Sequence, residues 1–301
     1  MRMLKYRKID AFTSGISTGN PAACIFIDSP LDDREMLDIA RQHRGFVSEV
    51  VFCRSNRSGI DLTYFSSEGE VSFCGHGTIA CMYCLIRETP ELSSLGEITV
   101  QTRRKGAVTV YNELATQDAI YVAAPEPRFI GTRLSRSEVA AALGSDDADV
   151  ISGSYQLDII DAGLRTLIVP VADLEPEVSM VPDQQALKRF CTENGIDIVL
   201  TFCTKTQNPE HIVHSRVFAP KFGYLEDPAT GSGNSALGFY MLNNNIWHGA
   251  DCAIEQGGKD REFNAVRLRR RENTVLFGGS ATIRIDGVYF IADVCPRHNL
   301  S

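Results

Sequence analysis

Hydrophobic and polar residues alternate in short runs along the first part of the chain, and these runs are rich in Val, Ile, Tyr and Phe. Such a pattern is typical of half-buried β-strands. It predicts strands at residues 5–12, 22–27, 49–53 and 61–65, and a hairpin over residues 98–111. Residues 33–43 differ, because Met36, Leu37, Ile39 and Ala40 recur at helical spacing. The first part is therefore predicted to be mostly strand, with a helix inserted.

The second part of the chain has a similar mixture. Strands are predicted at residues 156–160, 166–171, 198–202, 212–218, 266–270 and 281–285. Residues 184–193 are predicted to form a helix, and Ser135 with Glu138 forms a capping box that starts another one. Many strands with few helices favour an α+β fold, in which largely antiparallel sheets wrap around a helix, over a doubly wound α/β fold.

Two segments, one in each half, share the same local pattern. In each, a strand-rich run ends in an acidic turn and continues through a G-x-G into an apolar, helix-like stretch. The pairs that share an offset of 156 residues are Glu70 and Glu226, Gly75 and Gly231, Gly77 and Gly233, and Ala80 and Ala236. The chain is therefore predicted to contain a duplicated architecture. The crossover falls at residues 124–132, where Pro and Gly interrupt the periodicity.

The repeated G-x-G turns carry the first candidate chemistry. A helix that starts at such a turn leaves backbone N–H groups without partners, and its dipole favours an anion there. A single turn needs no explanation beyond the conformational freedom of glycine. Two turns at matching positions indicate a shared site that holds a carboxylate and stabilises developing negative charge. The residues of these turns are Gly75, His76, Gly77, Gly231, Ser232 and Gly233.

Other motifs argue against metal or nucleotide chemistry. Cys81 and Cys84 form a C-x-x-C on an apolar helix with no partner pair, so buried thiols are expected there. His211 and His214 lie in a strand-like run, where residues three apart point to opposite faces. There is no Walker A motif, and the G-x-G segments do not lie in a βαβ unit. We expect no metal and no cofactor.

Composition narrows the class of protein further. A length of 301 residues predicts two domains, and a net charge of −8 argues against nucleic acid as a partner. No apolar stretch is long enough to cross a membrane, and the N-terminus lacks the apolar region of a secretory signal. The nine cysteines are odd in number and scattered, which favours a reducing compartment. We therefore expect a cytoplasmic protein.

The motifs, in their order along the chain, resemble the PhzF-like family of phenazine-biosynthesis isomerases, which is related in fold to diaminopimelate epimerase. The resemblance covers essentially the whole chain and includes IDAFTSGISTGNPAACIF, VSEVVF, YFSSEGEVSFCGHGT, FAPKFGYLEDPATGSGNSA, EQGGKDREF and GGSATI. It implies two similar domains, each an antiparallel, β-barrel-like sheet around a central helix, with the active site in the cleft between them. We expect the domains at residues 1–124 and 125–285, with residues 286–301 returning to the first.

The resemblance also implies roles for single residues. Glu49, in the S-E-x-x-F signature, would be the catalytic acid/base, with His76 and Asp227 as auxiliary catalytic residues. The substrate-binding residues would be Asn20, Gly75, Gly77, Thr230, Gly231, Ser232 and Gly233. The implied reaction is a cofactor-free proton transfer within a small carboxylate-bearing substrate, such as a dihydroaromatic acid or a cyclic amino acid. Desolvation can raise the pKa of a buried carboxyl group enough for it to act as both donor and acceptor. A homodimer is also expected.

Two alternatives remain open at this point. Diaminopimelate-type epimerases use two cysteines at the G-x-G positions, whereas this chain has Cys74 at the first and Thr230 at the second. A dehydratase or epimerase of proline derivatives that uses Cys74 as its base with Thr230 is therefore the first alternative, because a helix N-terminus lowers the pKa of a thiol. The second is a non-catalytic module that binds a small ligand or another protein.

Overall fold

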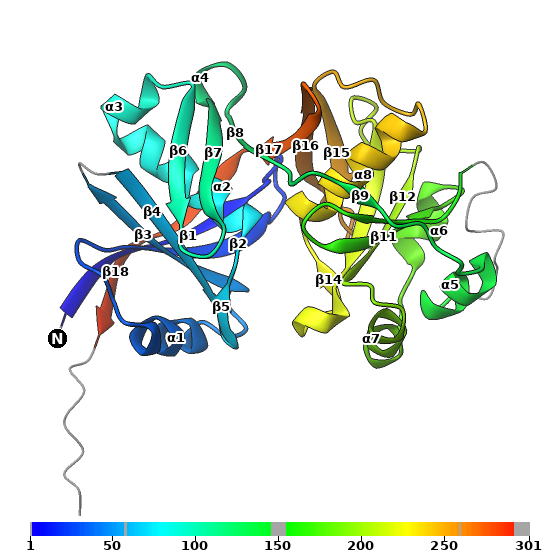
Figure 1. Cartoon of the computed structure of the whole chain (residues 1–301), viewed down its shortest axis with the longest axis horizontal. Helices are drawn as coiled ribbons and strands as arrows, with labels where there is room; N and C mark the ends of the chain where they lie inside the picture. Colours follow the sequence, from blue (N-terminus) through cyan, green and yellow to red (C-terminus); the bar gives the residue numbers. More distant parts are fainter. Residues whose placement is uncertain (1, 57–58, 146–154, 259, 292–301) are drawn as a thin grey trace, which may run out of the picture.

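The computed structural model describes residues 2–56, 59–145, 155–258 and 260–291 (Figure 1). Its first part, which we name the first repeat, runs from β1 to β8. The elements are β1 (Arg2–Ala11), β2 (Asn20–Phe26), α1 (Asp33–Gln42), β3 (Glu49–Asn56), β4 (Gly59–Ser66), β5 (Gly69–Val71), α2 (Gly75–Glu88), α3 (Pro90–Ser93), β6 (Glu97–Thr102), β7 (Gly106–Glu113), α4 (Leu114–Gln117) and β8 (Ala119–Ala123).

After β9 (Arg128–Phe129) and α5 (Arg136–Ala142), the second repeat runs from β10 to β17. Its elements are β10 (Asp158–Asp161), β11 (Arg165–Pro170), α6 (Leu174–Ser179), α7 (Gln184–Glu193), β12 (Ile198–Cys203), β13 (Val213–Phe218), η2 (Pro220–Phe222), β14 (Glu226–Asp227), α8 (Gly231–Asn243), β15 (Cys252–Gln256), β16 (Asn264–Arg271) and β17 (Thr274–Gly279). Strand β18 (Ala281–Ile291) ends the described chain.

Strand pairing follows the same plan in both repeats. Strands β2 and β3 pair in parallel across α1, and β11 and β12 pair in parallel across α6 and α7. Likewise β4 and β6 are parallel across α2, and β13 and β15 are parallel across α8. The remaining pairings of the described strands are antiparallel. The repeated strand order confirms the duplication that the glycine spacing predicts.

The repeats are joined more closely than the sequence predicts. The last strand of each repeat pairs with the other, β17 antiparallel to β8, so that the described strands form one hydrogen-bonded network. Each of these strands would otherwise expose an unpaired edge. Strand β18 pairs with β1 from Ala281 onward, whereas the predicted return spans residues 286–301, of which 292–301 lie outside the described residues.

Each repeat is built around one apolar helix, α2 in the first and α8 in the second (Figure 1). Most residues of both helices are buried, as expected for helices that are largely apolar around their circumference. Cys81 and Cys84 are fully buried free thiols, which confirms the prediction for the C-x-x-C. None of the helices in the described residues is long and apolar enough to span a membrane.

Local signals predicted several helix ends well. The capping box of Ser135 and Glu138 starts α5, and α7 spans the predicted residues Gln184–Glu193 after the N-cap Asp183. Helix α6 was missed, because its six residues are too few to show a period.

Candidate active site

Helix α2 begins at Gly75, where the chain leaves β5. Cys74 is its N-cap residue, with φ −128° and ψ 108°, and the thiol accepts a hydrogen bond from Gly77 N at 3.3 Å. A Cβ on Gly77 would lie 2.7 Å from Val51 Cγ2 on β3. Glycine at this position therefore lets the first turn of α2 lie directly against β3.

Helix α8 begins at Gly231 with nearly the same backbone geometry, because its N-cap Thr230 has φ −123° and ψ 104°. Thr230 does not cap the helix with its side chain. Its hydroxyl donates to the carboxylate of Asp227, and its N–H donates to Gln256 Oε1 at 2.9 Å. The first N–H groups of α8 therefore lack a side-chain cap, which suits them to an anion.

Both helix starts pack against a single ring, that of Phe277 on β17. A Cβ on Gly75 would lie 2.9 Å from Phe277 Cε2, and a Cβ on Gly231 would lie 2.4 Å from the same atom. The ring is 2% exposed. The strand that joins the repeats thus brings the two predicted G-x-G turns together.

Glu49 is the first residue of β3 and lies at the start of α2. Its side chain is 16% exposed, and Oε2 lies 3.3 Å from Nε2 of His76. The contact lacks hydrogen-bond geometry, and Glu49 Oε2 is buried without a hydrogen-bond partner among the described residues. Cys74 Sγ also contacts the His76 ring, at 3.5 Å from Nδ1 and 3.8 Å from Nε2. Leaving a buried carboxylate oxygen without a hydrogen bond is unfavourable, so this oxygen, with His76 as its close partner, stands out as a candidate for chemistry.

Asp227 lies between the repeats at the end of β14. Its carboxylate accepts a hydrogen bond from Asn20 Nδ2 at 2.9 Å, and Asn20 also donates to Ala229 O at 2.7 Å. The hydroxyl of Thr230 donates to the other carboxylate oxygen. Asn20, which is 1% exposed, therefore connects β2 of the first repeat to the turn before α8.

The charges of these buried groups act on one another. Burial raises the pKa of Asp227 to about 6, and the charge of Glu49 acts in the same direction, against His76 and the donors Thr230 and Asn20. Burial also raises the pKa of the Cys74 thiol well above its ordinary value, and the charges of Glu49 and Asp227 add to this effect. The structure thus brings together Glu49, Cys74, His76 and Asp227 beside both helix starts.

The raised pKa of Asp227 predicts a pH-dependent stability. The pKa rises from 3.8 to about 6 on folding, so the stabilisation from proton binding is complete below about pH 4 and is lost as the pH rises through about 6. A shift of about two units corresponds to roughly 3 kcal/mol. We expect the free energy of unfolding of the wild type to fall relative to that of Asp227→Asn over this range. Urea denaturation of both proteins measures the difference, and parallel pH curves would contradict the assignment.

Sequence reasoning missed two residues that interact with Asp227. Tyr224 lies just before β14, and burial together with the charges of Asp227 and Glu49 raises its pKa. Gln256 is fully buried and donates through Nε2 to Asp227 O at 2.8 Å. The only signal for Gln256 was its place in EQGGKDREF, which does not show what the side chain contacts.

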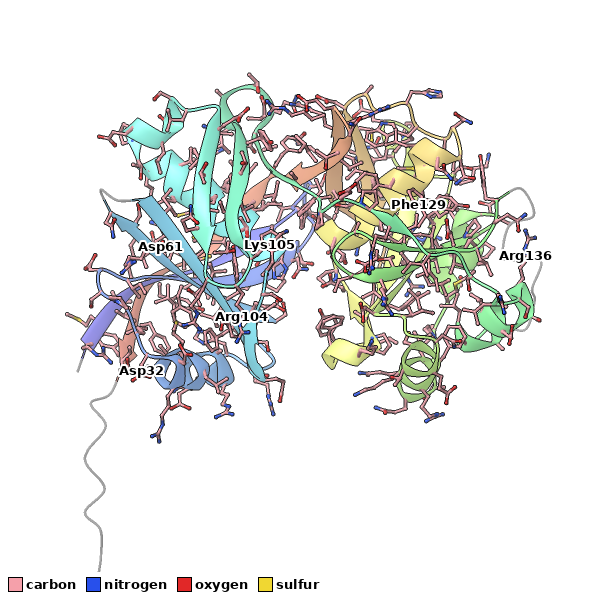
Figure 2. The ribbon with its side chains drawn as sticks, viewed as in Figure 1. Asp32, Asp61, Arg104, Lys105, Phe129 and Arg136 are labelled. Carbon is pink, nitrogen blue, oxygen red and sulfur yellow. The ribbon has the colours of Figure 1, made fainter. Side chains whose placement is uncertain are left out.

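A third missed residue, Lys105, brings positive charge close to the start of α2. Its Nζ lies 4.1 Å from the centre of the Phe73 ring, and Phe73 immediately precedes Cys74. Figure 2 shows Lys105 beside Arg104 at the turn from β6 to β7. Burial lowers the pKa of Lys105. The hairpin was predicted, but the position of its turn relative to α2 depends on the tertiary fold.

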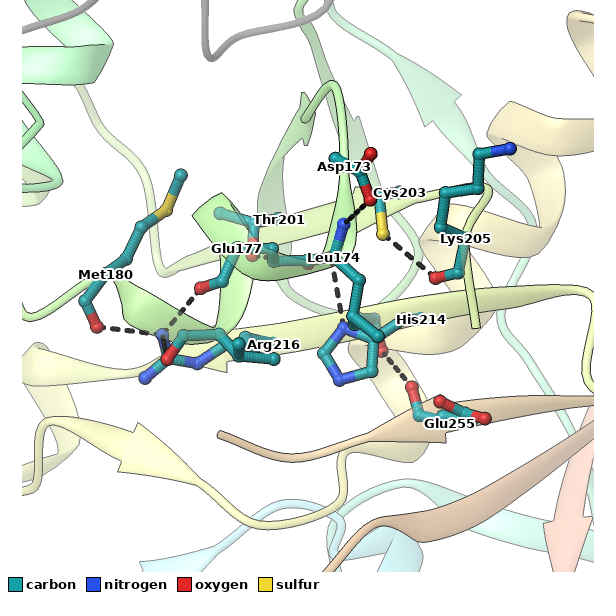
Figure 3. A network of polar contacts seen from close by, with 12 residues as sticks. Asp173, Leu174, Glu177, Met180, Thr201, Cys203, Lys205, His214, Arg216 and Glu255 are labelled. Atoms are coloured by element: carbon teal, nitrogen blue, oxygen red, sulfur yellow. Dashed lines mark hydrogen bonds and ion pairs between the residues drawn. The ribbon is translucent and has the colours of Figure 1, made fainter. Parts of the chain in front are cut away.

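A second polar network lies on the other face of the second repeat (Figure 3). Glu177, fully buried on α6, accepts hydrogen bonds from Thr201 Oγ1 at 2.8 Å and from His214 Nδ1 at 3.0 Å. Arg216 donates to the carbonyl oxygen of Glu177 at 2.8 Å and forms a bidentate pair with Glu226. The network holds α6 on the sheet and orients the residue that precedes Asp227.

The family model PhzC-PhzF, described as phenazine biosynthesis-like protein, matches residues 9–287. The chain belongs to the PhzC-PhzF family. Among its relatives, the uncharacterized isomerase YfhB of Bacillus subtilis is 31% identical over 95% of this chain and 96% of its own length.

Solved structures agree with this placement. A PhzF-family phenazine biosynthesis protein from Bacillus anthracis has a TM-score of 0.84 at 25% identity, covering 97% of this chain and 100% of its own. This confirms the predicted α+β fold. A probable proline racemase from Agrobacterium radiobacter has a TM-score of 0.61 at 10% identity, covering 98% and 94%, and shares the fold alone.

In this PhzC-PhzF protein, two groups of side chains carry potential metal ligands. Among the residues that the structure describes, they are Glu49 with Cys74 and His76, and Glu177 with Cys203 and His214, and within each group the ligand atoms lie within 4.8 Å of one another. His211 contacts Glu255, whereas His214 contacts Glu177.

Proposed function

We propose that this protein is a cofactor-independent isomerase that moves a proton within a small carboxylate-bearing substrate, with Glu49 as the acid/base. The observation that carries the proposal is the buried oxygen of Glu49, which accepts no hydrogen bond from the described residues and lies 3.3 Å from His76 Nε2 at the start of α2. Membership of a family whose relatives include proteins named as isomerases supports it. We further propose that the repeats form two domains, with the substrate between them.

The proposed step uses the groups in place around Glu49. The Glu49 carboxylate removes a proton from a carbon that an adjacent carboxylate or double bond makes acidic. The electron pair left on the carbon spreads toward the carboxylate-bearing side, where the N–H groups at the start of α8 stabilise it. The protonated Glu49 then returns the proton to another carbon of the same skeleton. We propose that His76 and Asp227 stabilise the negative charge that develops on the substrate and bind its polar groups.

A ligand screen tests whether the protein binds such a substrate at all. Dihydroaromatic acids and cyclic amino acids are added at millimolar concentration, and selective binding raises the melting temperature by mass action. Each hit is then incubated in D₂O and followed by ¹H NMR, where proton transfer replaces a carbon-bound hydrogen with deuterium. The proposal requires at least one ligand that both binds and exchanges. Stabilisation without exchange would favour a binding module.

The thiol alternative makes a different prediction for Cys74. Its raised pKa keeps the group a thiol, and a thiol is a poor base. We expect Cys74→Ala to reduce the exchange rate by less than about tenfold, whereas loss of a true acid/base costs about 10²–10⁴-fold. Exchange is compared with the wild type after circular dichroism has shown that the variant is folded. A loss in the larger range would select the Cys74-dependent dehydratase or epimerase.

A further inference from the structure

The turn of residues 227–230, which leads into α8, is held by buried side-chain amides along its whole length. Its four successive carbonyl oxygens each accept a hydrogen bond from a different amide. The pairs are Asp227 O with Gln256 at 2.8 Å, Pro228 O with Asn264 at 2.8 Å, Ala229 O with Asn20 at 2.7 Å and Thr230 O with Asn234 at 3.0 Å. The amides come from β15, β16, β2 and α8, and each residue is at most 3% exposed. Reorienting any peptide of this turn would break a buried hydrogen bond.

Two backbone groups of the turn fix the orientation of the Gln256 amide. The N–H of Thr230 can only donate, and it lies 2.9 Å from Oε1 of Gln256. The carbonyl oxygen of Asp227 can only accept, and it lies 2.8 Å from Nε2. Exchanging the two amide atoms would set one donor against another and one acceptor against another. Nε2 is therefore the atom that faces the hydroxyl oxygen of Thr230, at 3.2 Å.

The hydroxyl of Thr230 connects Gln256 to the carboxyl group of Asp227. Its oxygen accepts a hydrogen bond from Nε2 of Gln256, and its own proton is donated to a carboxylate oxygen of Asp227. The other carboxylate oxygen accepts a hydrogen bond from Asn20 Nδ2 at 2.9 Å. Both oxygens of Asp227 therefore accept hydrogen bonds, which favours the ionised form of the group.

The matching position in the first repeat shows where this hydroxyl would otherwise bind. Cys74 and Thr230 are N-cap residues with nearly the same backbone dihedral angles, and an N-cap side chain ordinarily accepts a hydrogen bond from an N–H group of the first turn. Cys74 does so, from Gly77 N at 3.3 Å. Thr230 does not, because Gln256 and Asp227 hold its hydroxyl in another direction.

We infer that Gln256 is a positioning residue of the proposed active site, which holds the hydroxyl of Thr230 away from the start of α8 and directs its proton to Asp227. The first N–H groups of α8 then stay open to a substrate carboxylate. The hydrogen-bond network stands on the geometry alone, whereas its effect on the reaction rests on the proposed function.

The network has a consequence for the protonation of Asp227. The other titratable groups that interact with this carboxyl group are Glu49 on β3, Cys74 and His76 on α2, and Tyr224 before β14. Burial raises the pKa of Asp227 to about 6, and the hydrogen bonds from Thr230 and Asn20 oppose the rise. A hydrogen bond to a charged group changes an ionisation equilibrium by roughly tenfold or more, which is about one pH unit. Without the Thr230 bond, Asp227 should therefore keep its proton to higher pH.

The network is tested by titrating Asp227 in the full chain labelled with [4-¹³C]aspartate, where the ¹³C NMR signal missing from Asp227→Asn gives the assignment. Gln256→Met should raise the pKa of Asp227 by about one pH unit, as Thr230→Val should. The double variant should shift it no further than Thr230→Val alone, because Gln256 acts through Thr230. Thr102→Val is the control, since it removes a hydroxyl that donates to Gly106 O at 2.8 Å in the β6–β7 hairpin, and it should leave the pKa unchanged. An unchanged titration in Gln256→Met, or additive shifts, would overturn the inference.

A measurement on the wild type does not depend on the folding of any Gln256 variant. One hydroxyl group separates Nε2 of Gln256 from the carboxyl group of Asp227. The side-chain ¹H–¹⁵N signals of Gln256, assigned through nuclear Overhauser effects to Thr230, should therefore shift at about pH 6, and this shift should be lost in Asp227→Asn. Signals that stay fixed across this range in the wild type would also overturn the inference.

The effect on the reaction is tested separately, with a substrate found by the ligand screen. In Gln256→Met the pH profile of exchange should move to higher pH together with the titration of Asp227, whereas loss of a residue that only stabilises the fold would lower the rate without moving the profile. A shifted titration with an unshifted profile would refute the role of Gln256 in the reaction. Exchange that does not depend on Glu49 would refute the proposed function and leave the hydrogen-bond network standing.

Discussion

Replacing Glu49 with glutamine is expected to stop proton transfer while leaving the fold intact. The carboxamide has the size of the carboxyl group but cannot accept the substrate proton. The exchange rate should therefore fall by about 10²–10⁴-fold or more. Because Oε2 of Glu49 has no hydrogen-bond partner among the described residues, the substitution removes no hydrogen bond at that atom. The free energy of unfolding should therefore be little changed. Deuterium incorporation into a bound substrate, measured by ¹H NMR, gives the rate.

A matched control for this variant is Glu68→Gln. Glu68 lies in the turn before β5, its side chain is 81% exposed, and its carboxylate contacts Arg44 and accepts a hydrogen bond from Ser67 Oγ at 3.4 Å. The same change in charge at this position should leave the exchange rate within about twofold of the wild type, because exposed ion pairs contribute little. Full activity in Glu49→Gln would show that Glu49 is not the acid/base. Equal losses of exchange rate in both variants would show that the change in net charge causes the loss.

Substituting Gly231 with alanine is expected to destabilise the protein and to weaken carboxylate binding together. The added Cβ would lie 2.4 Å from two atoms of the Phe277 ring, which is itself 2% exposed and held by the strand that joins the repeats. Overpacking of this kind costs about 1–3 kcal/mol. Relief requires α8 to shift, which would move the N–H groups that are proposed to bind the substrate. Urea denaturation measures the first effect, and ligand titration measures the second.

A double-mutant cycle with Phe277→Leu tests whether the contact with the Phe277 ring causes the loss of stability in Gly231→Ala. The smaller side chain should make room for the alanine, so that the double variant is more stable than the sum of the two single changes predicts. Gly287→Ala on β18 is the control, because a Cβ there meets no atom within 4 Å and should change stability by less than about 0.5 kcal/mol. Additive effects, or a Gly231→Ala variant as stable as the wild type, would contradict the close packing.

The residues of the site that belong to local sequence motifs could be predicted from the sequence. The two G-x-G turns mark helix starts by spacing alone, and Gly75 and Gly231 are the first residues of α2 and α8. Glu49 was identified as a candidate only by resemblance to a family, since a polar residue at the start of a strand has no distinctive pattern. Nothing in the sequence pointed to Phe277 or Tyr224, whose importance comes from contacts with segments far away in the chain.

The amino-acid sequence by itself determined the helices with clear caps, most of the strands and the duplication, because these depend on periodicity and on interactions within a few residues. Only the tertiary structure decided which groups meet. The parallel pairing of β2 with β3 and the first turn of α2 set Glu49 beside His76, and the hydrogen bonds of Asn20 join Asp227 to the first repeat. The pairing of β8 with β17 brings the two helix starts to one ring. Such contacts join residues separated by tens to hundreds of positions, and no local pattern encodes them because they depend on how the whole chain buries its apolar surface.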